Sequence, residues 1–304
     1  MAQQKGEVKE MINTRILTQE FDYFAPESIK QVVELLERHG EGARVIAGGT
    51  DLINQMKEEK MSPSCLVNIM NVKGLRYIKE DEGLRIGAAT KLRDVRAYCF
   101  KSRYVALYEA ISSLGKPQVW NMGTIGGNLC NASPAADTAP PLLVFKARVK
   151  LVGKDGEREL LLEDFFTGVN STVLQPTELM VEIHLDPAGD GAGNAFLKVA
   201  RVGADISKVS CAVFLKRQGR TCTECRVALG AVAPVPMRVK VVEEMIEGRE
   251  IEESLVAKAS EIVSEEVKPI DDIRSSAEYR RQVAAVTFRD VFWKAWDRAI
   301  GGKN

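Results

Sequence analysis

The chain has 304 residues, of which 45% are hydrophobic, so it is long enough for two domains that each bury a core. Its 42 Lys and Arg residues balance its 42 Asp and Glu residues, which gives no electrostatic reason to expect a nucleic acid or an anionic membrane as a partner. No apolar run approaches the roughly 20 residues of a membrane-spanning helix, and the first residues lack the hydrophobic stretch of a secretory signal. We therefore expect a cytoplasmic globular protein with no membrane span.

Helices and strands alternate in the first part of the chain. Residues 24–40 combine proline and serine start signals, apolar residues at helical spacing and a closing glycine, which predicts a helix. Residues 43–52, 64–70 and 83–90 contain β-favouring runs and predict strands. Residues 90–115 predict two helices.

A long segment punctuated by glycine and proline follows, and β-favouring residues return at 148–152 and 179–185. The run DPAGDGAG at 186–193 is the best linker candidate, so we predict a tail at 1–18, one domain at 19–188 and a second at 193–300.

The second domain reads as antiparallel strands at 196–202, 207–219 and 221–232, with a hairpin turn at 218–220. Helical periodicity at 241–267 and 276–300 then predicts a sheet with helices packed on one face. The expected fold class is α+β.

A first glycine motif, Ala47-Gly48-Gly49-Thr50-Asp51-Leu52, stands where a strand ends. Adjacent glycines allow positive φ and present bare N–H groups to an anion such as a diphosphate. Taken alone, the motif more often indicates just a tight turn.

A second motif runs from Gly123 to Pro141 and contains three glycines, two asparagines and no long charged side chain. A ligand could therefore lie directly against its main chain, although its prolines also suit a rigid structural connection. The chain has neither a G-x-G-x-x-G after its first strand nor a P-loop, and no plant-type cysteine cluster for an iron–sulfur centre of its own.

Together, AGGTDL (47–52) and GTIGGNLCNASPAADTAPPLL (123–143) resemble the two FAD-binding segments of the medium-subunit flavoproteins of the xanthine dehydrogenase and carbon monoxide dehydrogenase family. The runs at 196–213 and 226–238 resemble the start of that family's C-terminal domain. The resemblance covers nearly the whole chain after about residue 20.

This resemblance implies FAD as the cofactor, in a PCMH-type FAD-binding domain of two α+β subdomains whose cleft the C-terminal domain helps to close. It places the first motif at the diphosphate, Thr124 to Asn128 beside the diphosphate and ring, Asp137 at the far end of the cofactor and Lys198 near the flavin. The cofactor-binding residues expected by this similarity are Ala47, Gly48, Gly49, Thr50, Asp51, Leu52, Leu114, Gly115, Thr124, Ile125, Gly126, Gly127, Asn128, Ala136, Asp137, Leu179 and Lys198. No catalytic side chain and no metal ligand are expected.

The family resemblance further implies a heteromeric complex. A large molybdenum-cofactor subunit would oxidise the substrate, a small 2Fe-2S subunit would carry the electrons, and this chain would pass them through FAD to an acceptor such as NAD. The alternatives are a self-contained FAD-dependent reductase acting on a small substrate, and an assembly subunit with a degenerate site, which the intact glycine motifs disfavour.

Several side chains allow two interpretations. A cationic Lys198 would raise the potential of a flavin, but Lys198 or Arg201 could equally be solvated. Trp120 stands where relatives commonly carry a basic residue, and could stack on a partner or on the cofactor, or simply pack. Cys130 could contact the ring or pack as a small buried residue.

Cys222 and Cys225 invite a zinc or dithiol interpretation. We reject zinc, because the chain has only two histidines and no second cysteine pair completes a four-ligand site. In a regular strand, moreover, the two sulfurs would face opposite ways.

Overall fold

A computed structural model describes residues 17 and 19–299. The predicted tail therefore lies outside the described residues except at Leu17, as does the last residue of the predicted second domain. Within the described part of the chain, no helix is long and apolar enough to cross a membrane.

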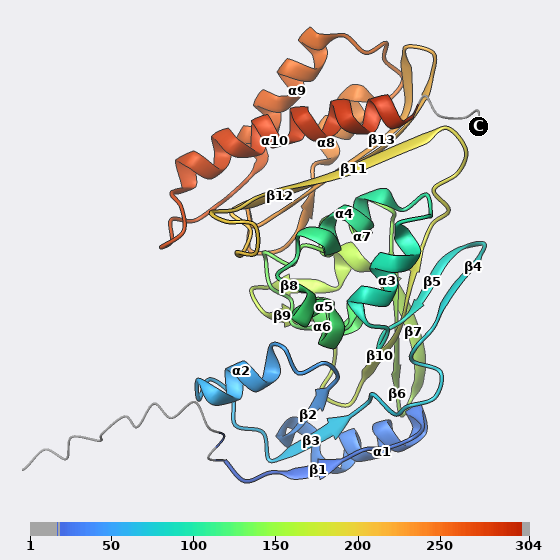
Figure 1. Cartoon of the computed structure of the whole chain (residues 1–304), viewed down its shortest axis with the longest axis vertical. Helices are drawn as coiled ribbons and strands as arrows, with labels where there is room; N and C mark the ends of the chain where they lie inside the picture. Colours follow the sequence, from blue (N-terminus) through green and yellow to red (C-terminus); the bar gives the residue numbers. More distant parts are fainter. Residues whose placement is uncertain (1–16, 18, 300–304) are drawn as a thin grey trace, which may run out of the picture.

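The described residues stack in three layers along the long axis of the molecule (Figure 1). The first layer is a three-stranded parallel sheet of order β1-β3-β2 with two helices. The predicted first helix is confirmed: the side chain of Ser28 caps it by accepting a hydrogen bond from the Gln31 N–H, and Gly40 ends it with a φ of 49°. The elements are β1 (Asp22–Phe24), α1 (Ile29–His39), β2 (Ala43–Ile46), α2 (Leu52–Lys57) and β3 (Cys65–Asn68).

The second layer contains an antiparallel sheet of order β4-β5-β10-β6-β7 and a group of short helices. Its strands are β4 (Ile78–Asp81), β5 (Gly83–Gly87), β6 (Arg148–Gly153), β7 (Gly156–Leu161) and β10 (Leu179–Leu185), with a small hairpin of β8 (Phe166–Gly168) and β9 (Ser171–Thr172). Its helices are α3 (Leu92–Cys99), α4 (Val105–Ser113), α5 (Pro117–Met122), α6 (Ile125–Cys130) and α7 (Ala139–Val144).

The segment between residues 116 and 147 is more helical than its sequence indicates. Its glycines and prolines suit a ligand-binding segment or a rigid connection and give no helical periodicity, yet it forms α5, α6 and α7. Each helix has only six residues, and Pro117 stands at the first position of α5, where a missing N–H costs nothing. Prolines at the start of α5 and α7 are therefore compatible with these helices.

The third layer is the C-terminal sheet, of order β11-β12-β13-β14, with three helices. Its elements are β11 (Ala192–Val199), β12 (Val209–Gln218), β13 (Thr221–Gly230), β14 (Met237–Arg238), α8 (Lys240–Ile246), α9 (Glu253–Glu266) and α10 (Ala277–Arg298). The predicted antiparallel sheet, its hairpin turn and its helices are confirmed, and β11 already begins within the last two residues of the predicted linker.

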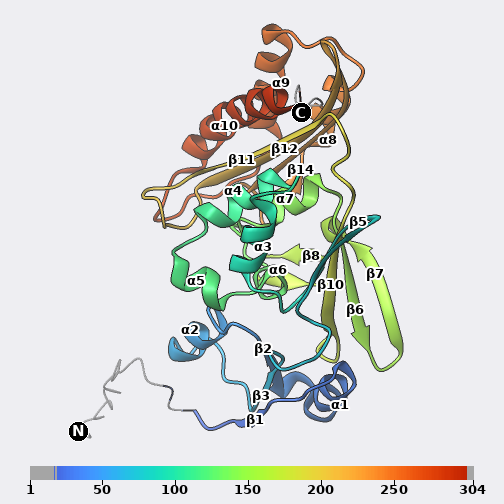
Figure 2. The same cartoon turned by 45° about the vertical axis from the view of Figure 1, so that its right-hand side comes forward.

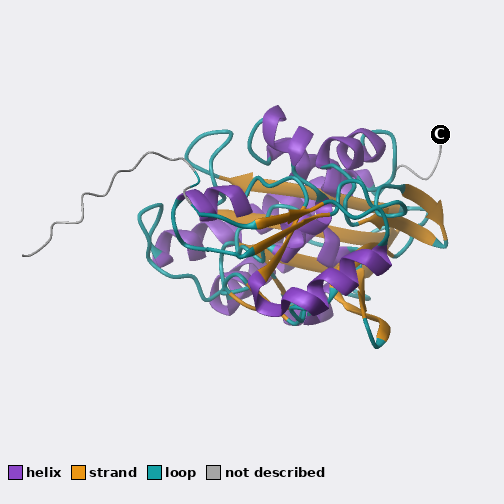
Figure 3. Cartoon of the chain, turned by 90° about the horizontal axis from the view of Figure 1, so that it is seen from below, coloured by secondary structure: helices purple, strands orange, loops and turns teal. Residues whose placement is uncertain are grey.

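Both faces of the C-terminal sheet are buried. Alternate residues such as Ala195 and Val213 pack with α8, α9 and α10, while Phe196 and Phe214 pack into the core of the second layer. Figure 2 shows α4 and α7 lying against the face opposite α10, in agreement with their contacts with β11, β12 and β13. Seen along the long axis in Figure 3, strands run through the middle and helices lie above and below them.

The expectation that Cys222 and Cys225 face opposite ways is wrong. The register of β12 and β13 shifts at this point, so that Cys225 pairs with Leu215 and Cys222 pairs with Arg217, leaving one extra residue in β13. Both thiols are buried in the same core.

An aromatic row connects the second and third layers. Phe145 is fully buried directly after α7, with its ring centroid 4.9 Å from that of Tyr104 and 5.6 Å from that of Phe214 on β12. These contacts join the two layers through packed side chains.

We expect Phe145→Ala to lower the free energy of unfolding by about 3–5 kcal/mol, because it leaves a cavity at the seam. Urea denaturation followed by circular dichroism measures the change. Ile273, which is fully exposed, provides the control: Ile273→Ala should change stability by no more than about 0.5 kcal/mol. Equal losses in the two variants would contradict this packing role.

Candidate functional site

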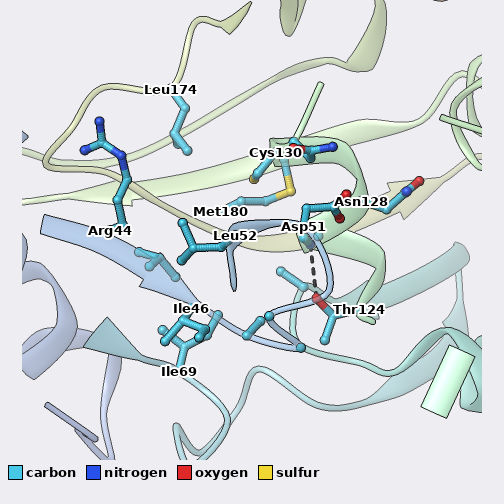
Figure 4. Close-up of a pocket in the computed structure, with 18 of the residues that line it drawn as sticks. Arg44, Ile46, Asp51, Leu52, Ile69, Thr124, Asn128, Cys130, Leu174 and Met180 are labelled. Atoms are coloured by element: carbon cyan, nitrogen blue, oxygen red, sulfur yellow. Dashed lines mark hydrogen bonds between the residues drawn. The ribbon is translucent and has the colours of Figure 1, made fainter. Parts of the chain in front are cut away.

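A cavity of about 1180 Å³ lies between the first and second layers. One wall comes from β2, the following loop and α2, and the other comes from α6, β10 and the segment before β10. Figure 4 shows Arg44 and Leu174 together at one side of the cavity and Thr124 and Asn128 at the other. The cavity exceeds the roughly 300–1,000 Å³ typical of small-molecule sites, as an extended ligand such as a dinucleotide requires.

Most of the residues expected at a cofactor lie in this one lining. They are Ala47, Gly48, Gly49, Thr50, Asp51, Leu52, Leu114, Thr124, Gly126, Gly127, Asn128 and Leu179. Among the described residues, none after Met180 lines the cavity, and closure of the cleft by the C-terminal domain stays a prediction.

The first glycine motif presents free main-chain donors to the cavity. The N–H groups of residues 48–51 make no hydrogen bond to another described residue. Gly49 has a φ of 69°, and a β-carbon on Gly48 would lie 2.0 Å from the carbonyl oxygen of Met122. Glycine is therefore required at 48 by close approach of two backbones, and the resulting nest of N–H groups suits an anion.

The second motif is held in place by main-chain hydrogen bonds to the segment after β5. The Ile125 N–H donates to the Thr90 carbonyl at 3.0 Å and the Gly126 N–H to the Ala88 carbonyl at 2.9 Å. Thr124 caps α6, since its hydroxyl accepts a hydrogen bond from the Gly127 N–H at 3.1 Å. Gly126 and Gly127 therefore line the cavity with main chain alone. The Ile125 side chain does not line the cavity and is fully buried in the core.

Asp137 and Lys198 do not line the cavity; they contact each other. The Lys198 Nζ lies 2.6 Å from Asp137 Oδ2 and donates to the Ser113 carbonyl at 3.1 Å, and both side chains are only 5% exposed. Lys198 is thus not solvated, whereas Arg201 is exposed and pairs with Asp205.

This buried pair does not line the cavity, but it adjoins residues that do. Ser113 precedes Leu114, and the Thr138 hydroxyl next to Asp137 donates to the Asn128 side chain at 2.5 Å. Gly115 and Ala136 are likewise outside the lining. Direct contact of these four residues with a cofactor stays a prediction.

Trp120 is partly buried and packs against the core of the second layer. Its indole N–H donates to the Leu114 carbonyl, and the Arg96 guanidinium lies 4.9 Å from its ring centroid. Trp120 therefore fixes the Leu114 main chain through this hydrogen bond, and it does not itself line the cavity.

The lining also includes residues that were not among the expected cofactor-binding residues. Gln55 donates to the Asn131 side chain at 3.0 Å and thereby joins α2 to the end of α6. Cys130 lines the cavity while also packing on the core, and burial raises the pKa of its thiol to about 12. Gly123, Cys130 and Asn131 lie within the second glycine motif. The other additional lining residues belong to neither motif, and they include Arg44, Ile46, Gln55, Lys60, Met61, Asn170, Thr172, Leu174, Gln175, Glu178 and Met180.

The donors and glycines present fit FAD. Unpaired N–H groups can receive the diphosphate, the glycine surfaces allow close approach, and Thr50, Thr124 and Asn128 offer polar groups along the same wall. Within the described residues, no group of three or more His, Cys, Asp or Glu residues could hold a metal ion.

Asp137 gives the folded protein a pH dependence. Burial outweighs the neighbouring Lys198 ammonium and raises the pKa of the Asp137 carboxyl from 3.8 to about 6. Because the folded state then holds this proton more tightly than the unfolded chain, the carboxyl stabilises the fold below about pH 4, and this contribution is lost as the pH rises to about 6.

We expect Asp137→Asn to remove this pH dependence. The wild type should lose stability relative to the variant between pH 4 and 6, by at most about 3 kcal/mol at roughly 1.4 kcal/mol per pKa unit. Urea denaturation of both proteins at several pH values tests it. If the stabilities of the two proteins changed in parallel between pH 4 and 6, the Asp137 carboxyl would not titrate within this pH range.

Comparisons with known proteins agree with this geometry. A family model described as the FAD binding domain in molybdopterin dehydrogenase matches residues 19–187, and one described as the CO dehydrogenase flavoprotein C-terminal domain matches residues 194–295. The carbon monoxide dehydrogenase medium chain of Hydrogenophaga pseudoflava is 31% identical over 280 residues, covering 91% of this chain and 98% of that protein. The xanthine dehydrogenase FAD-binding subunit of Escherichia coli O157:H7 is 32% identical over 266 residues, covering 86% of this chain and 91% of that protein.

A solved structure of the carbon monoxide dehydrogenase from Hydrogenophaga pseudoflava superposes on 93% of this chain and 99% of its own matching chain, with a TM-score of 0.91 and 31% identity. The predicted family, cofactor and fold class are confirmed by these matches. The chain belongs to the FAD-binding flavoprotein subunits of the molybdenum hydroxylase family.

Proposed function

We propose that this chain binds FAD in the cavity between its first two layers and serves as the electron-transfer subunit of a molybdenum hydroxylase. The observation that carries the proposal is the set of unpaired N–H groups at residues 48–51 in a glycine-walled cavity of about 1180 Å³. These donors would hold the diphosphate, because a concave nest of main-chain N–H groups binds anions.

The remaining residues act by positioning. Gly126 and Gly127 let the cofactor lie against main chain, and Thr124 and Asn128 offer a hydroxyl and an amide beside it. Lys198 pairs with Asp137 and donates to the Ser113 carbonyl, which precedes Leu114 of the lining. This pair therefore supports the cavity wall and places a buried ammonium close to it. When bound, FAD can accept electrons singly from iron–sulfur clusters and release them as a pair.

The partners of the chain follow from its relatives. These are named as a medium chain and an FAD-binding subunit, so each is one chain of a larger enzyme. We accordingly propose a large molybdenum-cofactor subunit and a small 2Fe-2S subunit as partners, with NAD as the electron acceptor. The cytoplasmic location stays a prediction from the sequence.

A self-contained reductase that acts directly on a small substrate is the second candidate. It would need a proton donor or acceptor free to act beside the flavin. The described lining contains no histidine, and its Glu178 is held by Arg158 through two 2.7 Å hydrogen bonds. The first function is favoured, because the matching relatives are named as one chain of a larger enzyme.

Anaerobic addition of NADH to the FAD-loaded chain tests the acceptor. We expect the visible absorption of oxidised flavin to bleach, because hydride exchange with a nicotinamide is reversible. An FAD that stays oxidised under NADH would overturn NAD as the acceptor, and a chain that refuses FAD altogether would overturn the proposed function.

Replacing Gly126 by alanine should weaken FAD binding by roughly tenfold or more. The new β-carbon would lie 2.7 Å from the Ala88 carbonyl oxygen, and an overpacking strain of about 1–3 kcal/mol would displace α6 from the wall. Fluorescence titration with FAD gives the Kd. In Gly203→Ala, the matched control, the new β-carbon would have no atom within 4 Å, so its Kd should equal that of the wild type.

A further inference from the structure

We propose that Glu109 and Asn194 are positioning residues that bind helix α4 to strand β11 and thereby fix the cavity wall at Leu114. This inference rests on the proposed FAD site and adds to it a link from the C-terminal domain. It explains how a domain with no residue in the described lining still bears on the cofactor.

The link begins at the amino end of α4. This helix has no side-chain cap of its own. Instead, the Asn194 side chain on β11 accepts a hydrogen bond from the Ala106 N–H at 2.7 Å and donates one to the Arg103 carbonyl at 2.8 Å. Asn194 is 3% exposed, so a residue of the C-terminal sheet supplies the cap that α4 lacks.

Glu109, in the middle of α4, makes the second contact. Its carboxylate accepts a hydrogen bond from the main-chain N–H of Phe196 on β11 at 2.8 Å, and it pairs with Arg298 at 2.6 Å and Lys294 at 2.9 Å on α10. Strand β11 is an edge of its sheet, so this carboxylate satisfies a donor that no neighbouring strand can reach.

Arg298 closes the network, because its guanidinium also donates to the Asn194 carbonyl at 2.8 Å. Although burial raises the pKa of Glu109, the hydrogen bonds from Arg298, Lys294 and the Phe196 N–H together lower it. Glu109 is therefore ionised at neutral pH and holds both cations.

The third contact lies at the carboxyl end of α4, where Lys198 donates to the Ser113 carbonyl at 3.1 Å. Residues 194, 196 and 198 of β11 lie on one face of the strand, so a single strand holds α4 at its start, middle and end. The next residue after α4 is Leu114, which lines the cavity. Movement of β11 or α10 would therefore displace this wall.

The test compares Glu109→Ala and Glu109→Gln with a matched carboxylate variant, Glu224→Ala, in the full chain. Glu224 lies at the same seam, pairing with Lys146 of the second layer and Lys216 of β12, but none of its described ion pairs involves α4. The readouts are the Kd for FAD, the visible circular dichroism of bound FAD and the thermal unfolding temperature.

We expect Glu109→Ala to raise the Kd for FAD by about tenfold and to change the circular dichroism of the bound flavin. Glu109→Gln should fall between this variant and the wild type, because its amide oxygen still accepts from Phe196. Glu224→Ala should lower the unfolding temperature but keep the wild-type Kd and flavin spectrum.

Two results would overturn the inference: wild-type FAD affinity and flavin spectrum in Glu109→Ala, or equal changes in Glu224→Ala. If Glu109→Ala does not fold, the glutamine variant decides by the same readouts. A wild-type chain that binds no FAD would instead refute the proposed function, so the two failures are distinguishable.

Discussion

The cavity depends on two places where main chains touch without side chains between them. One is Gly48 against Met122, and the other is Gly126 against Ala88; a β-carbon at either glycine would lie closer than 3 Å to a carbonyl oxygen. The first contact joins the loop after β2 to the end of α5, and the second joins α6 to the segment after β5. Because the first and second layers meet through bare backbone at Gly48, the N–H groups of residues 48–51 remain open to a ligand.

The C-terminal sheet is not an independent body beside this cavity. Its strands bury one face against their own helices and the other against α4 and α7, so two cores share one sheet. The polar groups at the seam are paired accordingly: Lys198 with Asp137, Glu109 with Arg298, and Asn194 with the start of α4. Buried pairs of this kind fix geometry more than they add stability, since desolvation offsets much of their attraction.

The sequence predicts those features whose cause is local. Ser28 and Gly40 mark the ends of α1, and the two glycine motifs mark the cavity wall, because capping and backbone approach demand particular residue types. Features set by distant partners are not predictable in this way. Strand periodicity cannot show that Lys198 contacts Asp137. The extra residue in β13 turns the Cys222 side chain to the other face of the strand, which the sequence pattern does not reveal. Lining residues such as Gln175 belong to no motif.

The described lining contains three carboxylates and one thiol. Its carboxylates are Glu41, Asp51 and Glu178, and of these Glu178 is engaged by Arg158. Burial raises the pKa of the Asp51 carboxyl, and a hydrogen bond from Thr50 acts in the opposite direction. The thiol of Cys130 stays protonated, so it is no nucleophile. Redox chemistry in this cavity must therefore belong to the cofactor, and the side chains around it set only its position and its electrostatic surroundings.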